Sequence, residues 1–166
     1  MKIALINPTP IDHYSPCIRT LSAHLKQHGH EVRLIFLPCD NYNTRFDPGY
    51  IKQMKQSLVE DLVECVSDCD LVGVSFLTSM FDVAVQATRA IQKAMPDMPI
   101  CWGGFHPSTM PQQALEFVDM VCVGEGEMPF LEEDVQITMA VGASDGTQSY
   151  QRLVARGRQR RDARGP

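Results

Sequence analysis

The fold is decided by residues 70–102, which read DLVGVSFLTSMFDVAVQATRAIQKAMPDMPICW. Residues 70–76 form an apolar run of strand length. The apolar positions over 82–94 then recur at the spacing of one helix face before two prolines end the pattern. A second short apolar run occupies 100–102. Apolar strands joined by a helix are typical of a parallel sheet, because helices cover both of its faces.

The same alternation extends to both sides of this unit. Further strands are expected at residues 2–7, 31–36 and 118–123, and further helices at 16–28, 51–66, 111–117 and from Glu127 through Leu131. Five strands that alternate with helices predict an α/β fold with a doubly wound, five-stranded parallel sheet. Ligands of such sheets bind beyond the carboxyl ends of the strands. The candidate loops are therefore 7–16, 37–49, 76–81, 103–110 and 124–128.

The composition is that of an ordinary globular protein. The chain has 166 residues, of which 44% are apolar and 21% are charged, and it predicts one folded domain whose core needs neither disulfides nor a metal. The six cysteines are scattered and no signal peptide precedes the first strand, so we expect a reduced, cytoplasmic setting. No apolar stretch approaches the roughly 20 residues of a membrane span, so no membrane partner is expected.

Charge divides the chain in two. Residues 1–151 carry nine Lys or Arg against nineteen Asp or Glu, whereas residues 152–166 carry six Arg and one Asp. The acidic body argues against a nucleic-acid partner, because phosphate binding needs clustered Lys and Arg. The periodic pattern fades after Asp134. We therefore expect one domain over 1–133 and a linker or disordered basic tail over 134–166.

Two glycine-bearing motifs at the expected strand ends carry candidate binding residues. Gly103 and Gly104 precede His106, and such glycines either form a tight turn or let the backbone approach a ligand. The motif Gly124-Glu125-Gly126-Glu127 opens an expected helix, either as its cap or as the border of a ligand pocket. The spacing alone leaves both alternatives open.

Hydroxyl side chains follow the third expected strand. Ser75, Thr78 and Ser79 lie where a switch in strand order would open a crevice. Such hydroxyls either cap a helix or bind the sugar or phosphate of a nucleotide.

Taken in order, these motifs resemble the cobalamin-binding domain at the front of cobalamin-dependent radical S-adenosylmethionine enzymes. The stretches that carry the likeness are Asn7-Pro8, His28-Gly29-His30-Glu31-Val32, Val72-Gly73-Val74-Ser75, Gly103-Gly104-Phe105-His106-Pro107, and Val118-Asp119 leading to Gly124-Glu125-Gly126-Glu127-Met128-Pro129-Phe130. The likeness runs from Met1 to about Glu132. It implies a flavodoxin-like sheet, with strand order 2-1-3-4-5, that holds cobalamin over its carboxyl edge.

The resemblance also implies which residues bind the cofactor. The loop after the first strand would lie near the corrin, the hydroxyls after the third strand would meet the nucleotide tail, and the paired glycines would let that tail pass close to the backbone. The acidic motif would border the pocket. The implied cofactor-binding residues are Thr9, Ser75, Thr78, Ser79, Gly103, Gly104, His106, Gly124, Glu125, Gly126 and Glu127.

The first loop departs from the pattern of other cobalamin carriers, which place a histidine on cobalt with Asp-x-His-x-x-Gly. Here Asp12 and His13 are adjacent, and Pro16 stands where the glycine would be. We therefore expect cobalamin to bind with its own base displaced and with no protein histidine as metal ligand, as the resemblance to the radical branch implies.

An iron–sulfur motif is also missing. The radical enzymes hold their cluster with Cys-x-x-x-Cys-x-x-Cys in a following barrel domain. Cys65 and Cys69 match the first spacing, but Val72 occupies the third position. The chain is therefore expected to carry no iron–sulfur cluster and to end before the barrel. It would not be catalytic alone, and its partner would be a radical S-adenosylmethionine barrel, missing or in another chain.

Two other classes share the expected topology. A phospho-receiver needs acidic residues after the first strand, an aspartate after the third and a lysine after the fifth, but Asn7, Ser75 and Gly124 stand there. The nucleotide-sugar-binding half of a glycosyltransferase remains the alternative. It would usually show a glycine-rich turn after the first strand, and residues 7–16 contain no glycine.

Overall fold

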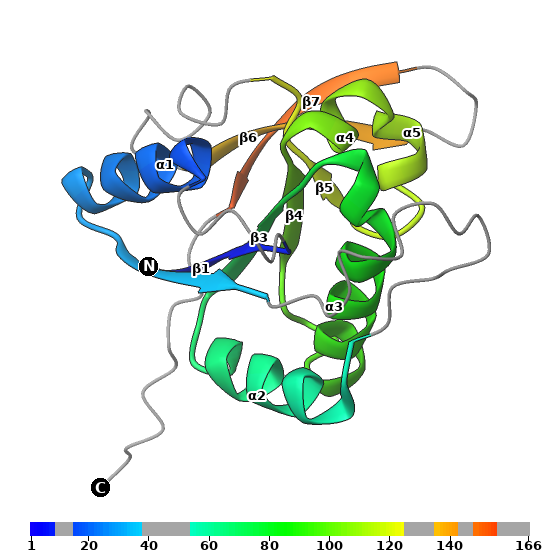
Figure 1. Ribbon diagram of the computed structural model, residues 1–166. Coiled ribbons are helices and arrows are strands. Elements are labelled where there is room, and N and C mark those ends of the chain that lie inside the picture. The colour runs from blue at the N-terminus through cyan, green and yellow to red at the C-terminus, as the bar shows by residue number, and fades with distance from the viewer. Residues whose placement is uncertain (9–14, 38–53, 125–134, 143–147, 156–166) are drawn as a thin grey trace, which may run out of the picture.

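The computed structural model describes residues 1–8, 15–37, 54–124, 135–142 and 148–155. Its main strands are β1 (Lys2–Asn7), β2 (Glu31–Phe36), β3 (Leu71–Ser75), β4 (Ile100–Gly103) and β5 (Met120–Val121). They form one parallel sheet with the order β2-β1-β3-β4-β5 (Figure 1). The expected doubly wound, flavodoxin-like sheet with strand order 2-1-3-4-5 is confirmed.

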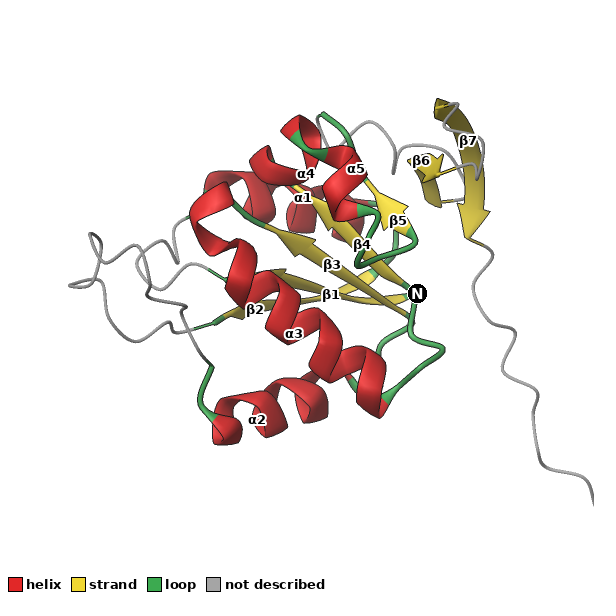
Figure 2. Cartoon of the chain, turned by 90° about the vertical axis from the view of Figure 1, so that its right-hand side faces the viewer, coloured by secondary structure: helices red, strands yellow, loops and turns green. Residues whose placement is uncertain are grey.

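Helices cover both faces of this sheet. They are α1 (Pro16–Gln27), α2 (Gln56–Val66), α3 (Phe81–Ala94), α4 (Phe105–Thr109) and α5 (Pro111–Ala114), and a 3-10 turn, η2 (Thr78–Met80), precedes α3. Figure 2 shows α2 and α3 against one face, and α1 lies against the other. The connections that enter α1, α3 and α4 all leave the carboxyl edge of the sheet.

The face under α2 and α3 is packed with large side chains. Trp102 of β4 is fully buried there, and its indole N–H donates a hydrogen bond to Thr88 Oγ1 of α3 at 2.8 Å. Phe76 meets the Trp102 ring edge-on with centroids 5.0 Å apart, and Phe117 stacks on the same ring at 5.5 Å. Aromatic pairs in these geometries add to the stabilisation from buried apolar area.

The face under α1 uses the alternate residues of the same strands, because successive strand side chains point to opposite faces. Ile3 and Leu5 of β1 pack there against Ile18 and Leu25 of α1. Leu25 is fully buried. These contacts explain the three- and four-residue spacing of apolar positions along α1.

Several boundaries differ from the sequence prediction. Helix α2 begins at Gln56 rather than at residue 51, and β5 covers only two of the six residues expected for it. Helix α4 was not expected, because residues 103–110, which include Pro107, were assigned to a loop. That proline lies in the first helical turn, where the missing N–H would have no partner within the helix. The helix expected from Glu127 through Leu131 lies outside the described residues.

Two further strands, β6 (Val135–Gly142) and β7 (Gln148–Ala155), pair antiparallel in a separate sheet. The assignment of 134–166 to a linker or disordered basic tail stays a prediction. Within this range, apolar residues alternate at Val135, Ile137 and Met139 with the two-residue period of a strand. The domain boundary near residue 133 stays a prediction.

Among the described residues, no helix has the length and apolar character that crossing a membrane would require.

Candidate functional site

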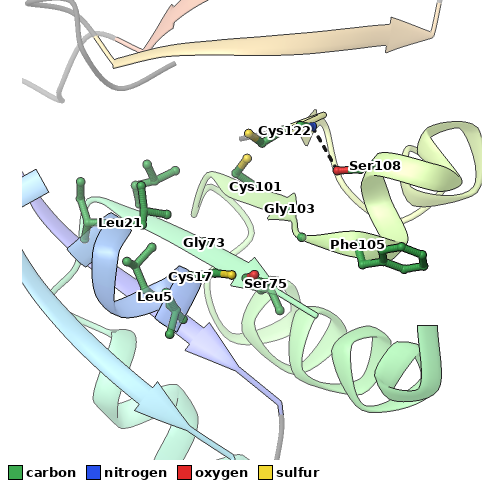
Figure 3. Close-up of a pocket in the computed structure, with 16 residues that line it drawn as sticks. Leu5, Cys17, Leu21, Gly73, Ser75, Cys101, Gly103, Phe105, Ser108 and Cys122 are labelled. Carbon is green, nitrogen blue, oxygen red and sulfur yellow. Dashed lines mark hydrogen bonds between the residues drawn. The ribbon is translucent and has the colours of Figure 1, made fainter. Parts of the chain in front are cut away.

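A pocket of about 400 Å³ opens on the α1 face of the sheet. Figure 3 shows its walls: α1 on one side, the strands β1, β3 and β4 as the floor, and α4 with the end of β5 on the other side. Its volume falls in the range of roughly 300–1,000 Å³ that is usual for small-molecule sites. The pocket reaches the carboxyl edge of the sheet, where parallel α/β folds bind their ligands.

The pairing of the strands explains why this face is hollow. Gly73 of β3 lies between Leu5 of β1 and Cys101 of β4. One residue further along, on the opposite face, Val74 lies between Ile6 and Trp102. The register therefore places a row with a glycine under α1 and a row of large side chains under α3. Gly73 stays partly exposed although β3 is the central strand.

Glycines at two floor positions keep the pocket open. A Cβ placed on Gly73 would lie 2.9 Å from Leu5 Cδ2, which is closer than two carbons normally approach. A Cβ on Gly103 would lie 3.6 Å from Cys122 Cβ, an ordinary contact, so it would fill space without a clash. Both side chains would project from the floor, since both glycines line the pocket.

Gly104 is required by the backbone itself. Its φ is +91°, and a Cβ there would lie 2.9 Å from the backbone nitrogen of Phe76. The loops after β3 and β4 are joined at this point, because Phe76 N–H donates to the Gly103 carbonyl and His106 N–H donates to the Phe76 carbonyl, each at 3.2 Å. Gly104 therefore allows the two loops to close the pocket's edge together.

A second contact ties α4 to the end of β5. The Gly124 N–H donates to Ser108 Oγ at 3.1 Å, and Gly124 has a φ of +90°. Ser108 and Ser75 bring hydroxyl groups to the pocket wall, from α4 and from the last residue of β3. The pocket thus has polar groups near the sheet edge.

Three thiols also line the pocket. Cys101 of β4 and Cys122, directly after β5, are buried, whereas Cys17 is exposed at the start of α1. Burial raises the pKa of the Cys101 thiol. The buried thiol is therefore neutral and behaves as a small apolar group.

Charge is absent from the pocket wall as far as the structure describes it: no Lys, Arg, Asp or Glu is among these lining residues. A pyrophosphate would need cationic side chains or a glycine-rich helix entry. The described wall therefore does not favour the nucleotide-sugar alternative. Its mostly apolar residues suit a ligand group that is itself mostly apolar.

The structure brings four of the expected binding residues together. Ser75, Gly103, Gly104 and Gly124 all line the pocket. The expected residues Thr9, Glu125, Gly126 and Glu127 lie outside the described part of the chain, as does His13.

Thr78, Ser79 and His106 are not among the residues that line the pocket. His106 is only 3% exposed and belongs to the aromatic cluster on the other face, with its ring stacked on Phe76 at a centroid distance of 5.5 Å. Its Nδ1 lies 3.2 Å from Thr78 Oγ1. Burial lowers the pKa of His106, so the ring is neutral near pH 7.

The parts of the pocket that come from α1 and from Gly73 of β3 were not predicted. Cys17, Ile18 and Leu21 form one wall, and Gly73 forms part of the floor. Gly73 gave a usable signal, because a glycine inside an apolar strand often marks a close approach of backbone or ligand. The α1 residues gave none, since their spacing is that of any buried helix face.

Two further observations concern the sheet edge. Asn7 is buried at the end of β1, on the same face as Ile3 and Leu5, and its Oδ1 has no hydrogen-bond partner among the described residues. Leu77 and Phe105, which follow β3 and β4, are 54% and 62% exposed. No cluster of three or more His, Cys, Asp or Glu in the described ranges is arranged to hold a metal ion.

Comparison with protein families agrees with this geometry. The model of the B12 binding domain matches residues 3–132. The chain therefore belongs to the B12-binding domain family. A comparison with curated proteins finds none that matches. Membership of the family supports binding of a cobalamin-type cofactor, and it does not favour the nucleotide-sugar alternative.

Proposed function

We propose that this chain is the cofactor-carrying domain of a radical S-adenosylmethionine methyltransferase-type system, and that it holds cobalamin over the carboxyl edge of its sheet. The nucleotide tail of the cofactor would occupy the pocket under α1. The observation that carries this proposal is the pocket of about 400 Å³, which two strand glycines keep open at that edge and whose described lining residues carry no charge.

The residues around the pocket fit the parts of cobalamin in order. Exposed Leu77 and Phe105 offer apolar surface on which the corrin ring can rest. Asn7 Oδ1 is a buried acceptor suited to an amide N–H of a corrin side chain. Ser75 and Ser108 can donate hydrogen bonds to the sugar and phosphate of the tail, and Gly103 lets the tail lie close to β4.

The proposal includes the base-off state without a histidine ligand. A base that lies under α1 is held away from the corrin and cannot reach its own cobalt. Among the described histidines, His106 is the one nearest in sequence to the loops at the carboxyl edge of the sheet. Its ring packs against Phe76 and Phe81, and its Nδ1 contacts Thr78 Oγ1. We expect His13→Ala to leave the absorption spectrum of bound hydroxocobalamin unchanged. A shifted spectrum would show that His13 ligates cobalt.

Cobalamin supplies a cobalt-bound methyl group to such systems when it is bound. The residues of this chain would shield the lower side of the corrin and leave its upper side open toward a partner. The barrel that holds the iron–sulfur cluster would be that partner, and the setting would be the reducing cytoplasm. This part of the proposal rests on the resemblance of the motifs between Met1 and about Glu132, in their order along the chain, to those of the radical enzymes.

The experiment is retention of hydroxocobalamin by the purified chain after free ligand is removed by gel filtration. We expect corrin absorbance to elute with the protein at one equivalent. Leu21→Trp is the blocking variant, because Leu21 lines the pocket and is only half-buried, so the larger ring can enter the pocket without overfilling the core.

Leu58→Trp is the matched control, since Leu58 is equally half-buried but packs against the opposite face. The control should retain the cofactor and the blocking variant should lose it. Absence of retained absorbance in the unmodified chain would end the proposal. Equal retention by both variants would show that the tail lies elsewhere.

A further inference from the structure

The pocket changes character along its length. Its mouth, at the level of Ser75, Gly104 and Ser108, has hydroxyl groups and free space above the glycines. Its inner end lies between Ile3 and Leu71, which are paired near the amino ends of their strands. From Leu71 to Ser75 the floor runs about 13 Å, at the rise of a β-strand. A polar mouth therefore leads to an apolar end across a length that suits a sugar and a bicyclic ring.

We propose that this pocket selects among cobalamin-type cofactors by their lower base, and that it prefers a benzimidazole to a purine. The inference rests on the proposed function, because it assumes that the nucleotide tail enters under α1. It concerns what lies deepest in the pocket, which the family assignment does not address.

The inner end offers a purine very few hydrogen-bond partners. Ile3, Leu71, Ile18 and Leu21 present only hydrocarbon. The backbone N–H and carbonyl groups of β1, β3 and β4 in the floor are used in the hydrogen bonds between the strands of the parallel sheet. The Cys101 thiol, a weak donor, is directed at the Trp102 carbonyl oxygen at 3.8 Å.

The two classes of base differ in the polar groups that they would bury. Adenine carries an exocyclic amine and ring nitrogens, each of which loses hydrogen bonds to water when it enters an apolar space without a partner. Dimethylbenzimidazole presents a hydrocarbon edge with two methyl groups, which gains from leaving water. An apolar pocket commonly discriminates by about 10–100-fold against an analogue that adds a polar group.

The test compares the dissociation constants of three probes, measured by absorbance titration of the purified chain. The probes are hydroxocobalamin, its analogue with adenine as lower base, and cobinamide, which has no nucleotide tail. We expect hydroxocobalamin to bind most tightly, the adenine analogue to bind about 10–100-fold more weakly, and cobinamide to be weaker than hydroxocobalamin as well.

The possible failures are distinguishable. Equal binding of hydroxocobalamin and the adenine analogue, with weak binding of cobinamide, overturns the selectivity but keeps the proposed function. Equal binding of hydroxocobalamin and cobinamide also overturns it, because the base would then make no contact. No binding of any probe overturns the proposed function and the inference together.

A pair of matched variants tests the role of the pocket floor. Cys101→Ser replaces a buried floor thiol by a hydroxyl that can serve a purine, so the preference for hydroxocobalamin should shrink several-fold. Cys69→Ser makes the same change at a buried thiol in the other core cluster and should leave the preference unchanged. Circular dichroism checks that both variants are folded. An unchanged preference in folded Cys101→Ser would contradict the inference.

Discussion

A single methyl group at the end of β4 tests the pocket most cleanly. Gly103 is not one of the described glycines with positive φ, so alanine can adopt its backbone conformation. The new Cβ would lie 3.6 Å from Cys122 Cβ, at an ordinary contact distance. Because glycine loses more conformational freedom on folding than alanine does, Gly103→Ala should raise the free energy of unfolding by about 0.5–1 kcal/mol.

The same methyl group takes space from the ligand. Overfilling a closely packed site costs roughly 1–3 kcal/mol of binding free energy, which corresponds to a dissociation constant about 5–150-fold larger. Stability and affinity are therefore expected to move in opposite directions. A general loss of structure would instead lower both.

The assay uses two titrations on the same preparation. Urea unfolding followed by circular dichroism gives the free energy of unfolding, and absorbance titration with hydroxocobalamin gives the dissociation constant. A Gly103→Ala protein that is at least as stable as the unmodified chain and binds hydroxocobalamin with the same affinity would refute the reasoning. The tail would then not pass over the end of β4.

Three further changes test the fold that carries the pocket. Gly104→Ala should destabilise the chain by at least about 1–2 kcal/mol in urea unfolding, because φ is +91° and the new Cβ would lie 2.9 Å from a backbone nitrogen; an unaffected midpoint would show that the loop rearranges freely. Thr88→Val removes the hydrogen-bond acceptor of the buried Trp102 indole and should lower the free energy of unfolding by roughly 1–3 kcal/mol. It should not weaken cobalamin binding, because Thr88 lies under the opposite face, and weaker binding would contradict this separation of the two faces. Hydrogen bonds from Lys2 and Arg33 lower the pKa of Asp68 from 3.8 to about 2, so its contribution to stability is present above pH 4 and is lost as the pH falls toward 2. Asp68→Asn should remove the part of the acid-unfolding profile that depends on this group, and an unchanged profile between pH 4 and 2 would contradict the assignment.

Local patterns predicted the sheet because the strands are apolar on both faces. β1 and β3 read as continuous apolar runs, and the helices between them carry clear stripes. Periodicity could not supply the strand order, since pairing depends on contacts between residues far apart in the chain. The order 2-1-3-4-5 came from the resemblance to cobalamin-binding domains.

The binding residues were predicted only in part for the same reason. Glycines after strand ends can be recognised locally, so Gly103 and Gly104 were found. The pocket itself depends on the register that places Gly73 between Leu5 and Cys101, which no local pattern contains. The direction of His106 was also out of reach, because its ring turns away from the pocket to stack on Phe76.

The central claim, that the cofactor's tail lies under α1, is tested most directly by protection of a thiol. Cys17 is exposed and lines the pocket, whereas Cys65 is exposed on α2, which covers the opposite face. The measurement is the alkylation rate of each cysteine by iodoacetamide, read by mass spectrometry, with methylcobalamin, with cobinamide and with no ligand. We expect methylcobalamin to slow the labelling of Cys17 well beyond the effect of cobinamide, while Cys65 reacts at an unchanged rate. Equal labelling of Cys17 with and without methylcobalamin, under conditions where the ligand is bound, would contradict this claim.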